Sequence, residues 1–225
     1  MKRFQEISPH SLHEGVYDKN IFKAFFLAGG PGSGKTRTVK FTTGGSGLKI
    51  VNSDDEFERL LVQAGLSLKM PGSETEPRDV LRARAKRITA LRKKNYVAGR
   101  LGLIIDGTGK DANKILRQKA KLEELGYDTY MIYVNTSIDV ALERNAKRGR
   151  SVPEAEVVKS WKNVQSNIGK FSNMFRKGFV VVDNNNATDD EFAVVWKRIS
   201  KLLQKKVTNT RATNWIALEL SKKKR

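Results

Sequence analysis

The stretch Ala28-Gly29-Gly30-Pro31-Gly32-Ser33-Gly34-Lys35-Thr36 decides the fold, because its last eight residues have the spacing G-x-x-x-x-G-K-[ST] of a phosphate-binding loop. Glycines let the backbone curl so that successive N–H groups point at phosphate oxygens. A following helix adds the positive end of its dipole. We expect ATP contacts from seven residues: Gly29, Gly30, Gly32, Ser33, Gly34, Lys35 and Thr36. Lys35 would reach the β- and γ-phosphates, and the Thr36 hydroxyl would bind Mg²⁺.

The sequence around this loop fits a phosphate-binding loop better than a glycine-rich turn that matches by chance. An apolar run rich in strand-forming residues, 21–28, precedes the loop, and residues 36–41 continue without a helix breaker. A buried strand before the loop and a helix after it are the context that the motif requires. The sequence therefore predicts binding of a nucleoside triphosphate.

Strand-like and helix-like segments alternate along the chain, which indicates an α/β fold with both faces of a parallel sheet covered. We expect a five-stranded parallel sheet sandwiched by helices, a P-loop NTPase fold of the nucleotide-kinase type with a helical lid at about 144–153. The expected strands are 21–28, 48–52, 101–106, 127–135 and 178–183. The expected helices after the first are a short one from about 54, then 79–97, 111–125, 137–148, 154–168 and 188–205.

The 225 residues suit one α/β domain with short additions at its ends. We expect an N-terminal extension over 1–20, the P-loop kinase domain over 21–206, and a basic C-terminal tail over 207–225. The short apolar patch at 215–218 is either a docked helix or a contact for a partner, and residues 221–225 are expected to be disordered.

Composition limits the setting in which this protein works. The sequence has no cysteine, no apolar run long enough to span a membrane and no apolar segment after Lys2 and Arg3 that would make a signal peptide. We expect no membrane partner and a cytoplasmic location, which for a phage-encoded protein would be the host cytoplasm. The oligomeric state is open.

The net charge of +19 indicates a polyanionic partner, most commonly nucleic acid, although a general solubility feature is the alternative. Residues 78–100 carry nine basic side chains and one acidic side chain. A basic surface near the catalytic cleft favours a nucleic-acid substrate over a small sugar nucleotide.

Acidic residues follow two of the expected strands, where ligands bind in open α/β sheets. Asp54 and Asp55 end one strand, where either could simply cap a helix, and Asp106 ends another. Hydrolytic P-loop enzymes typically place a glutamate after the strand-end aspartate, but Gly107 follows Asp106. The sequence therefore predicts phosphoryl transfer, with Asp54 or Asp55 orienting the acceptor hydroxyl.

Four cations in seven residues, Arg144 to Arg150, lie near an expected helix end. Guanidinium groups on a closing lid would clamp the transferring phosphates. The alternative is a solvated basic helix end that the helix dipole stabilises.

These motifs together resemble the kinase domain of phage-type polynucleotide 5′-kinases, within a wider group of P-loop kinases that includes zeta toxins. Four blocks carry the resemblance over about residues 21–170. They are Gly29–Thr36, Asn52-Ser53-Asp54-Asp55, Ile104-Ile105-Asp106-Gly107-Thr108, and Arg144-Asn145-Ala146-Lys147-Arg148-Gly149 with Val152-Pro153.

The resemblance implies an ATP- and Mg²⁺-dependent kinase with Asp54 as general base and Lys35 and Arg148 as catalytic cations. It assigns donor phosphate contacts to Arg148 and Arg144, and support of the acceptor site to Asp106. Asp55 and Arg59 are further acceptor-site candidates. The family usually carries arginines before and shortly after the acidic doublet, where this chain has Ser53 and Phe57.

The sequence leaves three functions open. The first is phosphorylation of a hydroxyl on nucleic acid, as by a polynucleotide 5′-hydroxyl kinase. The second is a kinase of another acceptor, either a UDP-sugar, as for zeta toxins, or a hydroxymethylated base in DNA. The third is a nucleotide-dependent nucleic-acid-binding module without catalysis.

Overall fold

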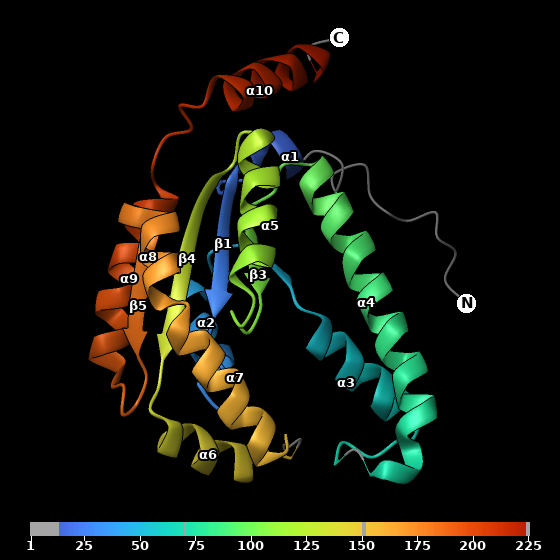
Figure 1. The fold of residues 1–225 in the computed structure, drawn as a ribbon. Coiled ribbons are helices and arrows are strands. Elements are labelled where there is room, and N and C mark those ends of the chain that lie inside the picture. Colours follow the sequence, from blue (N-terminus) through green and yellow to red (C-terminus); the bar gives the residue numbers. More distant parts are fainter. Residues whose placement is uncertain (1–13, 70, 150–151, 224–225) are drawn as a thin grey trace.

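A computed structural model describes residues 14–69, 71–149 and 152–223. Its centre is a five-stranded sheet in the order β2-β3-β1-β4-β5 in which every pairing is parallel (Figure 1). The strands are β1 (Lys23–Ala28), β2 (Lys49–Val51), β3 (Leu103–Asp106), β4 (Asp128–Asn135) and β5 (Phe179–Asp183). The chain builds β2 and β3 on one side of β1, then β4 and β5 on the other. A ligand site is expected at the carboxyl end of β1, where this reversal occurs.

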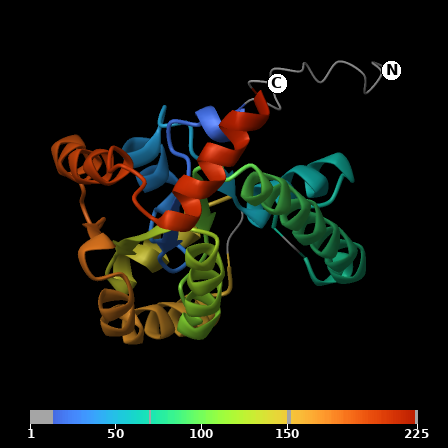
Figure 2. The ribbon, with the colours of Figure 1, turned by 90° about the horizontal axis from the view of Figure 1, so that it is seen from above.

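Helices cover both faces of the sheet, as predicted (Figure 2). One face packs on α2 (Lys35–Thr43) and α9 (Asp189–Leu203) through a core that includes Phe25, Ile132 and Phe192. The other face packs on α5 (Ala112–Glu124), α7 (Glu154–Ser166) and α8 (Ile168–Phe175). Strand β1 is buried along its whole length because helices cover both of its faces.

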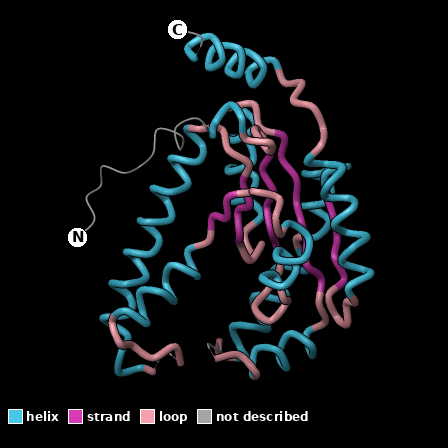
Figure 3. The backbone as a smooth tube through the Cα atoms, turned by 180° about the vertical axis from the view of Figure 1, so that it is seen from behind, coloured by secondary structure: helices cyan, strands magenta, loops and turns pink. Residues whose placement is uncertain are grey.

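Two helices stand to one side of these layers, beside the β2 edge (Figures 2 and 3). They are α3 (Ser53–Gln63) and α4 (Thr75–Ala98), joined by a segment that includes the 3₁₀ turn η2 (Gly72–Glu74). Phe57, Leu60 and Leu61 of α3 pack on Ala85 of α4 in a small core of their own. We call this pair the α3–α4 arm. Its position brings one side of the arm to the carboxyl edge of the sheet.

The C-terminal segment forms a docked helix, α10 (Thr210–Lys223), which crosses the opposite edge of the sheet from the P-loop (Figures 1 and 2). Ala212 is fully buried, and the Trp215 ring packs edge-on against Phe22 with centroids 5.6 Å apart. The expectation of disorder over 221–225 was wrong for 221–223, which belong to α10, and residues 224–225 lie outside the described part. At the other end, α1 (Glu14–Tyr17) is the described helix of the 1–20 extension.

The expected element boundaries were mostly right, and two departures have clear causes. Helix α4 begins at Thr75 rather than 79, because Pro77 lies in its first turn, where proline is tolerated. Helix α8 and the 3₁₀ turn η3 (Arg176–Gly178) occupy a segment for which no element was expected. Phe171 and Phe175 are both buried and lie one helical turn apart. This spacing of apolar residues is the sequence pattern from which α8 could have been predicted.

Helix α6 (Ile138–Ala146) precedes α7, and the α6–α7 corner lies at the carboxyl edge of the sheet (Figure 1). Across residues 14–69, 71–149 and 152–223, no helix is long and apolar enough to cross a bilayer.

Candidate active site

The phosphate-binding loop lies between β1 and α2, as predicted. Gly32 and Gly34 have positive φ angles of 76° and 82°, which favour glycine. A Cβ at Gly32 would also come within 2.1 Å of the Ala141 carbonyl oxygen on α6. Both positions therefore require glycine, for backbone conformation and, at Gly32, for the close approach of α6.

The residues that directly follow β4 and β5 hold the loop through hydrogen bonds to its backbone. The buried Asn184 side chain donates from Nδ2 to the Ser33 carbonyl at 2.7 Å, and the Thr136 hydroxyl donates to the same oxygen at 3.1 Å. Arg144 donates to the carbonyls of Asn184 and Asn185 at 2.6 and 2.7 Å. The Arg144 guanidinium thus holds the segment that follows β5, and Asn184 of that segment in turn holds the loop. These contacts are separate from the donor-phosphate role that was expected for Arg144.

The Lys35 ammonium lies within the loop, where it donates to the Gly29 carbonyl at 2.7 Å and the Gly30 carbonyl at 3.1 Å. Burial lowers the Lys35 pKa, and the nearby Arg148 charge lowers it further. The carboxylates of Asp106 and Asp54 act in the opposite direction. Lys35 therefore interacts with the charges of Arg148, Asp106 and Asp54, and a γ-phosphate bound at the loop would require such a cation.

The two acidic residues at the end of β2 differ in what they contact. Asn52 caps α3 by accepting from the Asp54 N–H at 2.8 Å, and its amide donates to the Asp55 carboxylate at 3.0 Å. Asn52 therefore supplies the helix cap that the sequence offered as an alternative role for Asp54. The Asp54 carboxylate pairs with Arg82 of α4 at 2.6 Å.

Arg82 connects the two helices of the arm next to this carboxylate. Its guanidinium lies over the Phe57 ring, 4.7 Å from the centroid, while it pairs with Asp54. A cation above an aromatic face is attracted by the ring quadrupole. The sequence has phenylalanine at position 57 where an arginine was expected, and the fold brings a guanidinium to the same place from 25 residues further along.

Asp106 ends β3 beside the loop, paired in register with Leu27 of β1. Burial raises the Asp106 pKa to about 6, and the negative charges of Asp54 and Asp55 raise it further, while Lys35 acts to lower it. Its Oδ1 atom is buried and has no hydrogen-bond partner in the described structure. A buried carboxylate oxygen without a partner is the kind of group that a ligand completes.

The oxygen atoms here suit Mg²⁺, which commonly keeps several waters and binds proteins through one or two side chains plus substrate phosphates. Thr36, Asp55 and Asp106 line one cavity next to the loop, of about 340 Å³. Thr36 and Asp106 are the residues that would hold the ion. Among the described residues, no group of three or more acidic or histidine side chains could hold a metal by itself.

The expected lid lies at the α6–α7 corner. The buried Asn145 side chain donates to the Val152 carbonyl at 2.7 Å and accepts from the Val152 N–H at 3.0 Å, which ties the end of α6 to the segment before α7. Arg148 lies exposed between them. Arg150, the last cation of the predicted cluster, lies outside the described residues.

A cavity of about 780 Å³ opens between the α3–α4 arm and the α6–α7 corner, with Asp54, Arg82, Asn145 and Pro153 among its lining residues. We call it the arm–lid cavity. Arg59, an expected acceptor residue, is not among its lining residues. The Arg59 guanidinium pairs instead with the buried Glu56, which also binds Arg92 at 2.9 Å.

The sequence matches the family described as an AAA domain (AAA_33) over residues 25–168, well over half of the chain. The chain belongs to this family. The matched range of the AAA domain begins in β1 and ends at the start of α8, so it contains the loop, the arm and the α6–α7 corner. A search of curated proteins found no match.

Solved structures share the fold of this AAA domain. A candidate kinase from Chloroflexus aurantiacus has a TM-score of 0.51 and 16% identity, with 82% of this chain and 97% of that chain covered. Shikimate kinase from Acinetobacter baumannii has a TM-score of 0.50 and 16% identity, covering 86% and 99%. A chain of the Pnkp1/Rnl/Hen1 RNA repair complex has a TM-score of 0.51 and 22% identity, covering 68% and 47%. The AAA domain thus has a P-loop, kinase-like fold.

Three residues of the candidate site were missed by sequence reasoning: Asn184, Arg82 and Asn145. Asn184 follows an apolar strand directly, so its place at the carboxyl edge was a readable signal. Arg82 lies in a helix dense with cations, and nothing in its spacing separated it from its neighbours. Asn145 belongs to the basic block that the sequence analysis singled out. Its hydrogen bond to Val152 joins residues seven positions apart, and the sequence does not show that they meet.

Proposed function

We propose that this protein is an ATP-dependent kinase that transfers the γ-phosphoryl group to a hydroxyl on nucleic acid, in the manner of a polynucleotide 5′-hydroxyl kinase. The observation that carries the proposal is the position of Asp54. Its carboxylate lines the open arm–lid cavity and lies close enough to Lys35 for the two charges to interact. A carboxylate that faces the P-loop lysine across the place of the γ-phosphate is the arrangement that transfer to an alcohol requires.

Asp54 would accept the proton of the acceptor hydroxyl as its oxygen attacks the γ-phosphorus. Arg82, paired with Asp54 at 2.6 Å, would orient the carboxylate before the acceptor arrives. Asp55 and Asp106, next to Asp54 in the fold, would support the acceptor site. The proton thus moves from the acceptor oxygen to Asp54, and the β–γ phosphoanhydride bond breaks as the new phosphoester bond forms.

Positive groups would bear the charge of the donor phosphates. The loop N–H groups, Lys35 and Arg148 are the chain's own contributions, while Arg144 keeps the loop in shape from behind. Mg²⁺ bound at Thr36 and Asp106 would neutralise charge on the β- and γ-phosphates. The Asn145–Val152 hydrogen bonds would set where Arg148 stands relative to the loop.

The net charge of +19 and the arginines that line the arm–lid cavity favour a polyanionic acceptor over a neutral one. The resemblance of the four sequence blocks to polynucleotide kinases supports the same choice. One solved structure of similar fold is part of an RNA repair complex, which is consistent with the proposal as a likeness in fold.

The test is to incubate the protein with γ-labelled ATP, Mg²⁺ and a panel of acceptors. The panel contains 5′-OH DNA, 5′-OH RNA, duplex DNA with hydroxymethylated bases, nucleosides and UDP-sugars. We expect label on the 5′-OH oligonucleotides, and activity toward them that falls steeply as salt rises.

Three results would overturn the proposal in different ways. Label on UDP-sugars, with activity indifferent to salt, would indicate a zeta-toxin-like kinase. Label that is retained within hydroxymethylated duplex DNA after removal of its terminal phosphates would indicate a base kinase. Tight binding of both ATP and DNA without any labelled acceptor would indicate a binding module.

A further inference from the structure

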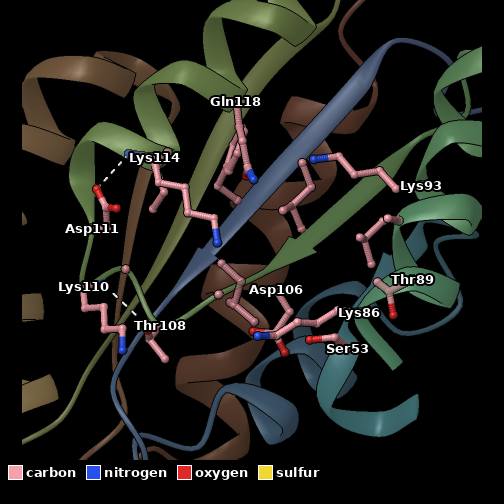
Figure 4. A pocket seen from close by; sticks show the side chains of 18 residues that line it. Ser53, Lys86, Thr89, Lys93, Asp106, Thr108, Lys110, Asp111, Lys114 and Gln118 are labelled. Atoms are coloured by element: carbon pink, nitrogen blue, oxygen red, sulfur yellow. Dashed lines mark hydrogen bonds between the residues drawn. The ribbon is translucent and has the colours of Figure 1, made fainter. Parts of the chain in front are cut away.

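A second cavity lies on the other side of Asp106, between α4 and α5 (Figure 4). Its volume is about 460 Å³, and Ser53 and Asp106 line its active-site end. Four lysines line it: Lys86 and Lys93 from α4, and Lys110 and Lys114 from the segment that enters and begins α5. We call it the lysine cavity. It is separate from the P-loop and from the arm–lid cavity, and the proposed reaction uses none of its lysines.

The four ammonium groups have no hydrogen-bond or ion-pair partner among residues 14–69, 71–149 and 152–223. By contrast, Arg82 and Arg92 of α4 and Lys119 of α5 each pair with a carboxylate: Asp54, Glu56 and Glu123 respectively. Asp111, the second acidic residue of the cavity, caps α5 by accepting from the Lys114 N–H at 2.9 Å. Figure 4 shows Lys114 and Lys93 reaching into the cavity from opposite walls.

Placing these like charges together costs free energy in the empty protein. Burial lowers the pKa of Lys93, and the positive charges of Lys114 and Lys121 lower it further. A site that gathers repelling cations around a hollow gains most when an anion enters it, because the anion removes the repulsion and pairs with each cation.

The cavity continues a basic row along α4. Arg82, Lys86, Thr89 and Lys93 are spaced four, three and four residues apart, which puts them on one face of the helix. At 1.5 Å per residue, the row from Arg82 to Lys93 is about 16 Å long. Arg82 marks its start at Asp54, in the arm–lid cavity, and Lys93 marks its end in the lysine cavity.

We propose that the lysine cavity binds the phosphodiester backbone of the acceptor strand beyond the nucleotide that carries the reacting hydroxyl. The strand would enter with its reacting end at Asp54 and run along α4 between Lys86 and Lys93 on one side and Lys110 and Lys114 on the other. This inference rests on the proposed function, since it assumes a nucleic-acid acceptor. It adds that affinity depends on strand length through several phosphates.

The test compares two triple variants of equal charge change. The first is Lys86→Gln, Lys93→Gln and Lys114→Gln. The matched control is Lys197→Gln, Lys201→Gln and Lys205→Gln, three exposed lysines on α9 and just beyond it, away from both cavities. Each protein is assayed with a 5′-OH dinucleotide and with a 5′-OH octanucleotide over a range of salt concentrations. The KM for ATP and the melting temperature report on the fold and the donor site.

We expect the cavity variant to lose about tenfold or more in kcat/KM for the octanucleotide, with little change for the dinucleotide. The slope of log KM for the octanucleotide against log salt should become shallower by about 2, because each lost phosphate contact to a single strand contributes about 0.7. The α9 control should keep the octanucleotide preference and the original salt slope.

The two proposals fail in distinguishable ways. If the unaltered protein phosphorylates neither oligonucleotide, the proposed function is wrong, and the strand path falls with it. If it phosphorylates both, but the cavity and control variants behave alike, the strand path alone is wrong. An equal loss on the dinucleotide and the octanucleotide would also overturn the path, because it would place the lysines at the reacting end.

Discussion

The proposed donor side and the proposed acceptor side of this site are built in different ways. On the donor side, glycine conformations and buried hydrogen bonds fix the loop, with Asn184 and Thr136 both donating to the Ser33 carbonyl. On the acceptor side, charged side chains on the α3–α4 arm face open cavities, and few of them are buried. A triphosphate always presents the same atoms, so a rigid backbone cradle would serve it, whereas the long acceptor that we propose would need a broad surface of charge.

The same contrast is seen in how the two sides pack. The loop leaves β1, which is buried on both faces in the main core. The arm has its own small core around Phe57 and Ala85, and Glu56 adds an ion-pair network with Arg59 and Arg92. A unit with its own core can move relative to the sheet at lower cost than the loop can. The difference teaches that the proposed reaction would require a carboxylate on the more independent unit to meet a lysine on the rigid one.

The largest effect on kcat is expected for Asp54, the arm residue that we propose as the base. Asp54→Asn should lower kcat by about 10²–10⁴-fold, because the amide cannot accept the acceptor proton. Steady-state kinetics with the best acceptor would measure this, and nucleotide binding should be unchanged. Glu58→Gln, on the same helix, is the matched control and should keep most of the activity. Full activity in Asp54→Asn would remove Asp54 as the base.

On the rigid side, Lys35→Ala should lower kcat by about 10²–10³-fold, because a preorganised cation at the γ-phosphate is lost. It should also weaken ATP binding, which isothermal titration would measure. Far-ultraviolet circular dichroism should show that the fold survives. If Lys35→Ala kept both ATP binding and transfer, the loop would not be the donor site.

Asn184→Ala tests whether the bracing of the loop matters. Removal of the amide leaves the Ser33 carbonyl with one donor and should reduce the free energy of unfolding by about 1–3 kcal/mol. The KM for ATP should rise, while the KM for the acceptor should stay the same. Chemical denaturation and kinetics would measure these changes, with the exposed Asn186→Ala as control. Equal effects on both KM values would contradict the division into two sides.

The smallest effect concerns Asp106, whose folded-state pKa of about 6 exceeds the ordinary value of 3.8. The folded protein binds this proton more tightly than the unfolded chain, so the ionised carboxylate destabilises the fold above pH 6. This destabilisation is relieved as pH falls through 6 toward 4. Asp106→Asn should therefore raise the free energy of unfolding by about 1–3 kcal/mol at pH 7.5 and by less at pH 5. Urea denaturation at the two pH values would measure this, and equal gains would contradict the pKa shift.

Much of the fold was predictable because local patterns and global architecture agree in this chain. The five strands, the phosphate-binding loop and the cap residues Asp111, Ser137 and Thr188 are all readable from neighbouring residues. The start of α4 was expected after Pro77, at 79, and no helix was expected between residues 168 and 178, so the first turn of α4 and the whole of α8 were not predicted. Both depend on packing partners that the sequence does not identify.

The candidate site was predictable where a motif stands on a single element. Lys35 and Thr36 follow from the loop, and Asp54, Asp55 and Asp106 follow from their places at strand ends. Arg82 and Asn184 come to the site from elements distant in the sequence. Their roles depend on which neighbour lies opposite, and a single sequence carries no signal for that.

The sequence by itself determined the chemistry at the donor end, because the phosphate-binding loop needs glycines at fixed spacing and supplies its own backbone donors. It also determined the alternation of strands and helices, and hence the parallel sheet. Only the tertiary structure decided which acidic side chains interact with Lys35, which guanidinium lies over Phe57, and that lysines from α4 and α5 share one cavity. The physical reason is that charge–charge and cation–ring contacts act through space, between residues that the chain itself leaves far apart.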